Sequence, residues 1–152
     1  MDQREMMSKI EQLIEDAKTA ILATAGKDGA PHMRWMTPVV VKGRPGTIFA
    51  VTSPHSPKAA QLGSHPEVEW MIQTRALDQI VNVKGKINPL DNPSIKMEVI
   101  ESLGKRLTAF WKINAEKMDF IVLETIIEEA TYYSPMKGKK ETVKFESLEE
   151  SI

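Results

Sequence analysis

The chain has 152 residues and a formal net charge of −1 at pH 7, and 41% of its residues are hydrophobic and 27% are charged. This length and composition suit one globular domain over residues 1–152. A dedicated nucleic-acid binder usually carries a basic excess, so no nucleic-acid partner is expected. Because cysteine is absent, the sequence excludes disulfides, thiolate nucleophiles and cysteine-ligated clusters, and it suits a reducing compartment.

The N-terminal part of the chain predicts a helix followed by a hairpin. Apolar residues recur at helical spacing over residues 2–18, which is the pattern of an amphipathic helix. A short apolar run at residues 20–24 leads into Gly-Lys-Asp-Gly at residues 26–29, a strong hairpin signal, and the chain returns as a strand over residues 33–41. Pro38 within that strand indicates a sheet edge or a bulge.

The middle of the chain predicts a third strand, a short helix and a second hairpin. The strand covers residues 47–52, and Ser56 is a suitable N-cap for a brief helix over residues 58–63. Residues 68–74 and 79–87 are rich in β-branched and aromatic residues, and a short connection joins them. We expect these two segments to pair as antiparallel strands.

The C-terminal part predicts a helix, a long strand and a tail. The helix covers residues 92–111, with Gly104 marking a potential break, and the strand covers residues 120–133. Residues 137–152 are strongly charged and are expected to fray or to lie on the surface. Six mainly antiparallel strands with three helices indicate an α+β, mainly β fold; a small closed barrel or a partly open sheet fits this pattern.

The segment with the most groups suited to binding a ligand is residues 49–58, where a strand ends in a hydroxyl-rich loop that starts a helix. Unpaired N–H groups and the helix dipole at such a position favour an anion such as phosphate. Lys58 would add a charge-assisted hydrogen bond of about 1.5 to 3 kcal/mol, and Thr52, Ser53 and Ser56 would supply hydroxyl groups. The alternative is that Ser56 only caps the helix and Lys58 is solvated.

Other common catalytic and binding motifs are missing from the sequence. It has no glycine-rich dinucleotide motif, no Walker loop and no Gly-x-Ser-x-Gly, and no acid, base or nucleophile stands out as catalytic. Three histidines, His32, His55 and His65, lack the spacing of a metal site, so no metal is expected. No apolar run reaches the length of a signal-peptide core or a bilayer-spanning helix, so we expect a cytoplasmic protein without a membrane partner.

Four segments together resemble a known family. Thr-Ala-Gly-Lys-Asp-Gly-Ala-Pro-His at residues 24–32, the strand at 33–39, the loop at 52–58 and Val-Lys-Gly-Lys at 83–86 are similar, in order and spacing, to the FMN-binding split barrels of the pyridoxamine 5'-phosphate oxidase-like family. The general stress protein 26 branch is the most similar, and the resemblance runs from about Lys9 to Tyr133. It implies a six-stranded antiparallel Greek-key split β-barrel with flanking helices, and a homodimer that holds FMN between its subunits.

The resemblance also implies which residues hold the cofactor. The strand with Arg34, Trp35, Met36 and Thr37 would contact the isoalloxazine ring and ribityl chain, and Thr52, Ser53, Ser56 and Lys58 would bind the phosphate. Gln79 is similar to a family glutamine that reaches the flavin, although it is one position out of register. Trp111 would lie near the flavin of the partner subunit, or would be an ordinary core tryptophan. Pro57 stands where the family loop often has arginine, so one phosphate-binding guanidinium is missing.

These implied residues predict a flavoprotein, with three functional readings left open. The first is an FMN-dependent oxidoreductase acting on an unidentified small molecule, in which the flavin transfers the hydride or electrons. The second is a non-enzymatic flavin-binding module of a stress response. The third is a split barrel that uses deazaflavin F420 or haem. The C-terminal extension that binds substrate in the true oxidases is not recognisable, so pyridoxamine phosphate is not the expected substrate.

Overall fold

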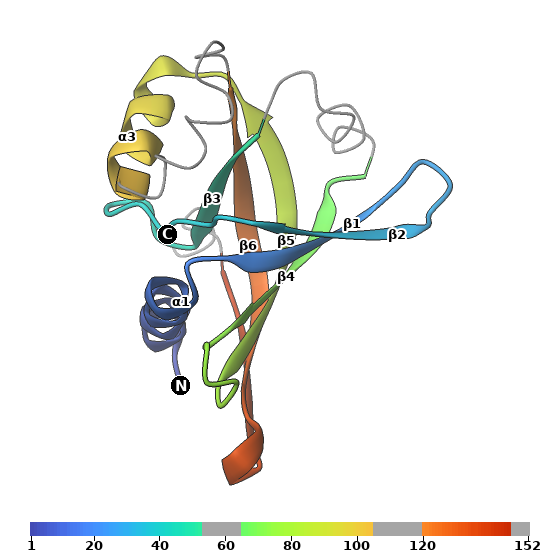
Figure 1. The fold of residues 1–152 in the computed structure, drawn as a ribbon, viewed down its shortest axis with the longest axis vertical. Helices are drawn as coiled ribbons and strands as arrows, with labels where there is room; N and C mark the ends of the chain where they lie inside the picture. Colours follow the sequence, from blue (N-terminus) through green and yellow to red (C-terminus); the bar gives the residue numbers. More distant parts are fainter. Residues whose placement is uncertain (53–64, 105–119, 147–152) are drawn as a thin grey trace.

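The computed structural model describes residues 1–52, 65–104 and 120–146 of the chain. A strongly twisted antiparallel sheet forms its body, and α1 and α3 lie on one side of the sheet in the view of Figure 1. The elements in chain order are α1 Gln3–Ala17, β1 Ala20–Ala25, β2 Pro31–Met36, β3 Thr47–Thr52, β4 Glu67–Gln73, β5 Ile80–Leu90, α3 Pro93–Leu103, β6 Ile121–Ser134, the 3₁₀ helix η2 Pro135–Lys137, and β7 Lys139–Lys144.

The strand order confirms the predicted fold class, a mainly antiparallel sheet with flanking helices. The strands follow the order β2-β1-β4-β5-β6-β3, and β7 pairs with β6. The sheet does not close, because β2 and β3 stand at its two ends and pair only through a bridge between Val39 and Phe49. Two backbone hydrogen bonds of 2.8 Å form that bridge. The arrangement is consistent with a split barrel, and we call the unpaired stretch between β2 and β3 the split.

Residues 139–144 of the expected tail do not fray: they form a seventh strand, which is mostly exposed on the surface. β6 is long enough to pair with β3 through its first half and with β7 through its second half, along the same edge. The chain reverses through η2, and Gly138 adopts a left-handed φ of 62° that favours glycine. Val143 and Phe145 alternate with the exposed polar residues Thr142, Lys144 and Glu146 and pack against the core, so the dense charge conceals a strand pattern.

Other boundaries differ from the predicted ones for local reasons. The predicted strand over residues 33–41 ends at Met36, since Pro38 lacks the N–H that a further ladder bond requires. The helix predicted over 92–111 is seen as α3 up to Gly104, where φ is 52°. Its remainder, together with the brief helix predicted over 58–63, lies outside the described residues.

The core lies on the inner face of the sheet. α1 covers it with an apolar stripe, and the indole N–H of the fully buried Trp70 donates to the hydroxyl of Thr125 at 2.9 Å. A second cluster packs Val99 and Leu103 of α3 against Phe49 of β3. The buried residues of the α1 stripe are Met6, Ile10, Leu13 and Ile14. This packing fixes which side of each strand faces inward and therefore which side chains are free for function.

Candidate functional site

The strand β2 presents the predicted ring-contacting residues on two opposite faces. It is an end strand of the sheet, and its side chains alternate in direction as in any strand. Met36 is buried and Arg34 is half-buried on the inner side, whereas Met33 and Trp35 are 73% and 72% exposed on the outer side. The Arg34 and Trp35 side chains therefore cannot lie on the same face of one flavin bound against the strand.

Arg34 is a partly buried cation without an acidic partner among the described residues. Its Nη2 donates to the hydroxyl of Thr24 at 3.1 Å, a neutral acceptor. Burial holds the pKa of the Arg34 guanidinium below its ordinary value. By contrast, Arg44 forms an ion pair with Glu98 at 2.6 Å. A partly desolvated guanidinium that hydrogen-bonds only a hydroxyl has donors left for an anion.

Thr52 stands across the split from β2. It is buried at the end of β3, and the Val39–Phe49 bridge sets an antiparallel register between the two segments. Beyond this bridge the described residues of β2 and β3 do not pair, so Met36 and Thr37 lie on the β2 side of the split and Thr52 lies on the β3 side. The structure thus brings Met36, Thr37 and Thr52 to the two sides of the split. Ser53, Ser56 and Lys58 of the predicted phosphate loop lie outside the described residues, as does Trp111.

Gln79 is held at a different place. It precedes β5, and its side-chain carbonyl oxygen accepts hydrogen bonds from the Tyr132 hydroxyl at 3.0 Å and from Lys9 Nζ at 3.3 Å. Lys9 belongs to α1, so the amide is engaged between α1 and the sheet. The strand register aligns Arg34 with Val83 of β5, which is three strands away from β2. Val83 is itself four residues beyond Gln79 along the chain, so Arg34 and Gln79 lie far apart on the sheet. Within one subunit the two residues are not brought together.

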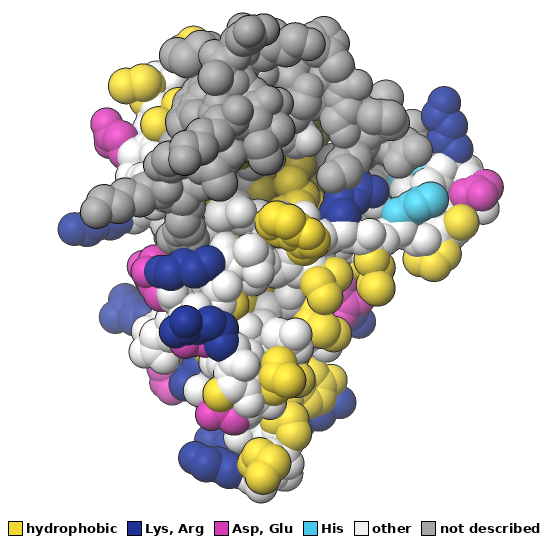
Figure 2. Space-filling view, viewed as in Figure 1, with side chains coloured by type: hydrophobic (Ala, Val, Ile, Leu, Met, Phe, Trp, Pro, Cys, Tyr) yellow, Lys and Arg dark blue, Asp and Glu magenta, His cyan; other side chains and the backbone are white. Residues whose placement is uncertain are grey.

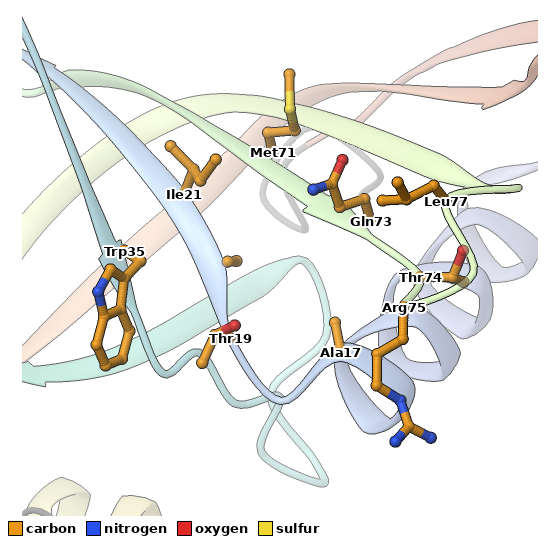
Figure 3. Close-up of a pocket in the computed structure, with 10 residues that line it drawn as sticks. Ala17, Thr19, Ile21, Trp35, Met71, Gln73, Thr74, Arg75 and Leu77 are labelled. Carbon is orange, nitrogen blue, oxygen red and sulfur yellow. The ribbon is translucent and has the colours of Figure 1, made fainter.

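A pocket of about 200 Å³ lies on the outer side of the sheet, and Trp35 is the one predicted site residue among its described lining residues. Figure 3 shows Trp35, Ile21 and Met71 on three neighbouring strands, with Ala17 at the end of α1, Thr19 directly before β1 and Arg75 in the turn after β4. The signal for it is present in the sequence, because Ile21 and Met71 are apolar at the positions of their strands that do not face the core.

The described residues also contain neither a metal-binding group nor a spanning helix. They hold no cluster of three or more histidine or acidic side chains with the geometry of a metal site. None of their helices has the length and apolar character required to span a bilayer.

Solved structures with the same fold include proteins with different names. A protein from Clostridium acetobutylicum, related to general stress protein 26 and of the pyridoxinephosphate oxidase family, has TM-score 0.73 and 16% identity, with all of both chains covered. A pyridoxamine 5'-phosphate oxidase-related, FMN-binding protein from Nostoc punctiforme has TM-score 0.64 and 13% identity, covering 92% of this chain and 96% of that one. A haem-binding protein from Mycobacterium smegmatis has TM-score 0.68 and 15% identity, covering 88% and 57%.

The family follows from the sequence itself, since identities this low indicate only a shared fold. No curated protein has a matching sequence. The family model described as pyridoxamine 5'-phosphate oxidase matches residues 6–134, which include most of α1, the split and all the described strands except β7. The chain therefore belongs to the pyridoxamine 5'-phosphate oxidase family.

Proposed function

We propose that this protein binds FMN at the split and works as an FMN-dependent oxidoreductase on a small molecule, as a homodimer in the cytoplasm. Its family supports a flavin, and the structurally similar protein from Nostoc punctiforme is named as FMN-binding. The proposal extends to the cofactor and the class of reaction, and it names neither a substrate nor a physiological electron donor.

The observation that carries the proposal is the environment of Arg34. The guanidinium is partly desolvated and, among the residues that the structure describes, bonds only the Thr24 hydroxyl. It stands on the inner side of the strand that borders the split. Since a partly buried cation is stabilised by an opposite charge, this position favours a ligand with an anionic group. FMN carries such a group in its phosphate, and reduced flavin also develops negative charge on its ring.

The split offers further groups that fit a flavin. As an end strand, β2 has an edge along which N–H and C=O groups are free of sheet pairing, and these groups can bond the pyrimidine edge of the ring. Met36 provides an apolar surface, and Thr52 brings a hydroxyl to the opposite side. Bound flavin would supply the hydride or electron transfer, and the protein residues would bind it, orient it and exclude water.

A haem-binding role is the second candidate, because one structurally similar protein is named for it. The visible absorption spectrum of the purified full-length protein separates flavin, deazaflavin F420 and haem directly. Reduction of the bound flavin by a nicotinamide donor and reoxidation by an acceptor supports the oxidoreductase. A flavoprotein that stays redox-silent with every donor supports instead a flavin-binding module without turnover.

The decisive binding experiment compares FMN with riboflavin by fluorescence titration. Arg34→Gln should weaken FMN binding at least about ten-fold, because a hydrogen bond to a charged group contributes about 1.5 to 3 kcal/mol. If the guanidinium binds the phosphate, riboflavin should bind the wild type and the variant equally. Arg4→Gln, which removes an exposed arginine of α1, is the matched control and should change neither affinity. A colourless wild-type protein that is indifferent to added FMN refutes the proposal.

A further inference from the structure

A second pocket, of about 210 Å³, lies on the outer side of the sheet over β4, β5, β6 and β7. Figure 2 shows hydrophobic side chains gathered over β2, β1 and β4, whereas the side chains that line this pocket are all polar or charged. They form three rows across the strands. The first row is Glu69, Lys84 and Glu129, the second is Asn82, Thr131 and Thr142, and the third is Tyr133 and Lys140. We call this site the polar pocket.

The first row makes one end of the polar pocket acidic. Its two carboxylates, Glu69 and Glu129, are half-buried and stand on either side of one ammonium, that of Lys84. Neither carboxylate forms an ion pair with Lys84 or with any other residue that the structure describes. Because a partly desolvated carboxylate is stabilised by an opposite charge, this end favours a ligand with an ammonium group.

The third row makes the other end basic. The ammonium of Lys140 lies 5.3 Å from the centre of the Tyr133 ring, and no described acidic side chain forms an ion pair with it. Tyr133 also carries a phenolic O–H, which can donate a hydrogen bond. A cation beside a hydroxyl donor suits a carboxylate, so the two ends of the pocket favour groups of opposite charge.

The second row supplies an amide between these two ends. The side-chain carbonyl oxygen of Asn82 is buried, and among the described residues no donor reaches it. Beside it, the hydroxyl groups of Thr131 and Thr142 bond each other at 3.0 Å. A buried acceptor without a donor destabilises the protein, and in native structures it usually has a partner. Because the terminal amide of asparagine rotates readily, it can present both C=O and N–H to a peptide group in the pocket.

The distance between the two ends indicates the length of the ligand. Glu129 and Tyr133 lie four residues apart on β6, which is about 13 Å along the strand, and Lys140 stands opposite Tyr133 on β7. Two extended residues span about 7 Å from end to end. An ionic contact of about 3 Å at each end accounts for the rest of the distance. A dipeptide therefore reaches both ends, and a single amino acid does not.

We propose that the polar pocket binds a short peptide with free termini, of dipeptide length. Its ammonium group lies at Glu69 and Glu129, its peptide group bonds the Asn82 amide, and its carboxylate lies at Lys140. This inference goes beyond the proposed function and does not depend on it, because the polar pocket is on the outer side of the sheet and Arg34 is on the inner side.

The first test titrates glycylglycine into the nitrogen-labelled full chain and follows its amide NMR spectrum. The side-chain signals of Asn82 should shift and saturate with a dissociation constant of about 1 mM, because partly exposed ion pairs each contribute little. Glycine reaches only one end and should bind at least about three-fold more weakly. If glycylglycine causes no saturable shift of the Asn82 signals, or if glycine binds equally well, the inference is overturned.

The second test determines the orientation of the peptide. Lys140→Gln should weaken glycylglycine about three-fold or more and should not weaken glycylglycinamide, which has no carboxylate. Lys139→Gln is the matched control, since Lys139 is the neighbouring exposed lysine outside the pocket. Glu129→Gln should weaken glycylglycine and leave N-acetylglycylglycine, which has no ammonium, unchanged. If each variant weakens the free and the blocked peptides equally, the proposed orientation is wrong.

The third test separates a binding role of Asn82 from a structural one. Asn82→Leu should weaken glycylglycine about five-fold or more, because it removes both hydrogen bonds to the peptide group. It should not lower the Tm of the free protein, because the lost acceptor has no described donor. Asn88→Leu changes an exposed asparagine of the same strand and should leave binding unchanged. A fall in Tm with Asn82→Leu alone means that the amide already has a structural partner, and this result overturns the inference.

FMN titration of the same variants distinguishes this inference from the proposed function. Lys140→Gln and Asn82→Leu should leave the affinity for FMN unchanged, since neither residue faces the split. A protein that binds glycylglycine and no flavin supports the polar pocket and refutes the cofactor proposal. A protein that binds FMN and no glycylglycine overturns the polar pocket and leaves the cofactor proposal standing.

Discussion

A β-bulge between β5 and β6 requires glycine at position 85, and replacing this residue tests the packing of the sheet. The pairing shifts by one residue between Lys84 and Gly85, which leaves Glu128 of β6 as the extra residue. A Cβ at position 85 would overlap the carbonyl oxygen of Ile126, and it would lie 3.0 Å from the carbonyl carbon of the same residue and 3.1 Å from Cγ2 of Thr125. The obstacle is backbone in the middle of the sheet, so it cannot simply rotate away.

Gly85→Ala should therefore lower the free energy of unfolding by about 3 kcal/mol, which is near the upper end of the range for overpacked cores. In a chain of this length about 1 kcal/mol lowers Tm by roughly 2 to 4 °C, so the expected fall is about 6 to 12 °C. Urea unfolding followed by circular dichroism gives the free energy of unfolding directly.

Gly26→Ala is the matched control for the same chemical change. Its Cβ would come within 2.9 Å of Nε2 of His32, which is the end of an exposed side chain that can swing aside. We expect a loss below about 1 kcal/mol. If Gly85→Ala proves no less stable than Gly26→Ala, the close approach of β5 and β6 is not as described.

Three other substitutions have defined outcomes. Thr125→Val leaves the buried indole N–H of Trp70 without its acceptor, so it should lower the free energy of unfolding in urea by about 1 to 3 kcal/mol. Thr131→Val removes an exposed hydroxyl and should change the free energy of unfolding in the same assay by less than about 0.5 kcal/mol. Leu77 has a left-handed φ of 61°, so Leu77→Asn should raise the free energy of unfolding by up to about 1 kcal/mol in the same assay, and a fall would contradict the strain. Lys58→Ala should weaken FMN binding about ten-fold or more in a fluorescence titration, and an unchanged affinity would remove Lys58 from the cofactor site.

Local patterns predicted the elements whose signals are contained within a few residues. The apolar spacing of α1, the Asp28-Gly29 turn between β1 and β2, and the strands of the β4–β5 hairpin all occur close to where the sequence predicts them. β7 was not predictable in the same way, because its strand pattern is dominated by lysines and its stability depends on the distant edge of β6. A segment that is stabilised by a long-range partner carries little local evidence of its own structure.

The candidate site was predictable as a set of segments and not as a set of side chains. The resemblance selected β2 and the end of β3, and the structure places both beside the split. Side chains alternate along a strand, so Trp35 lies on the outer face while Arg34 and Met36 lie on the inner one, and contact of all three residues with a flavin stays a prediction. The position of Gln79 depends on Lys9 in α1, seventy residues away in sequence, and nothing near Gln79 indicates that contact.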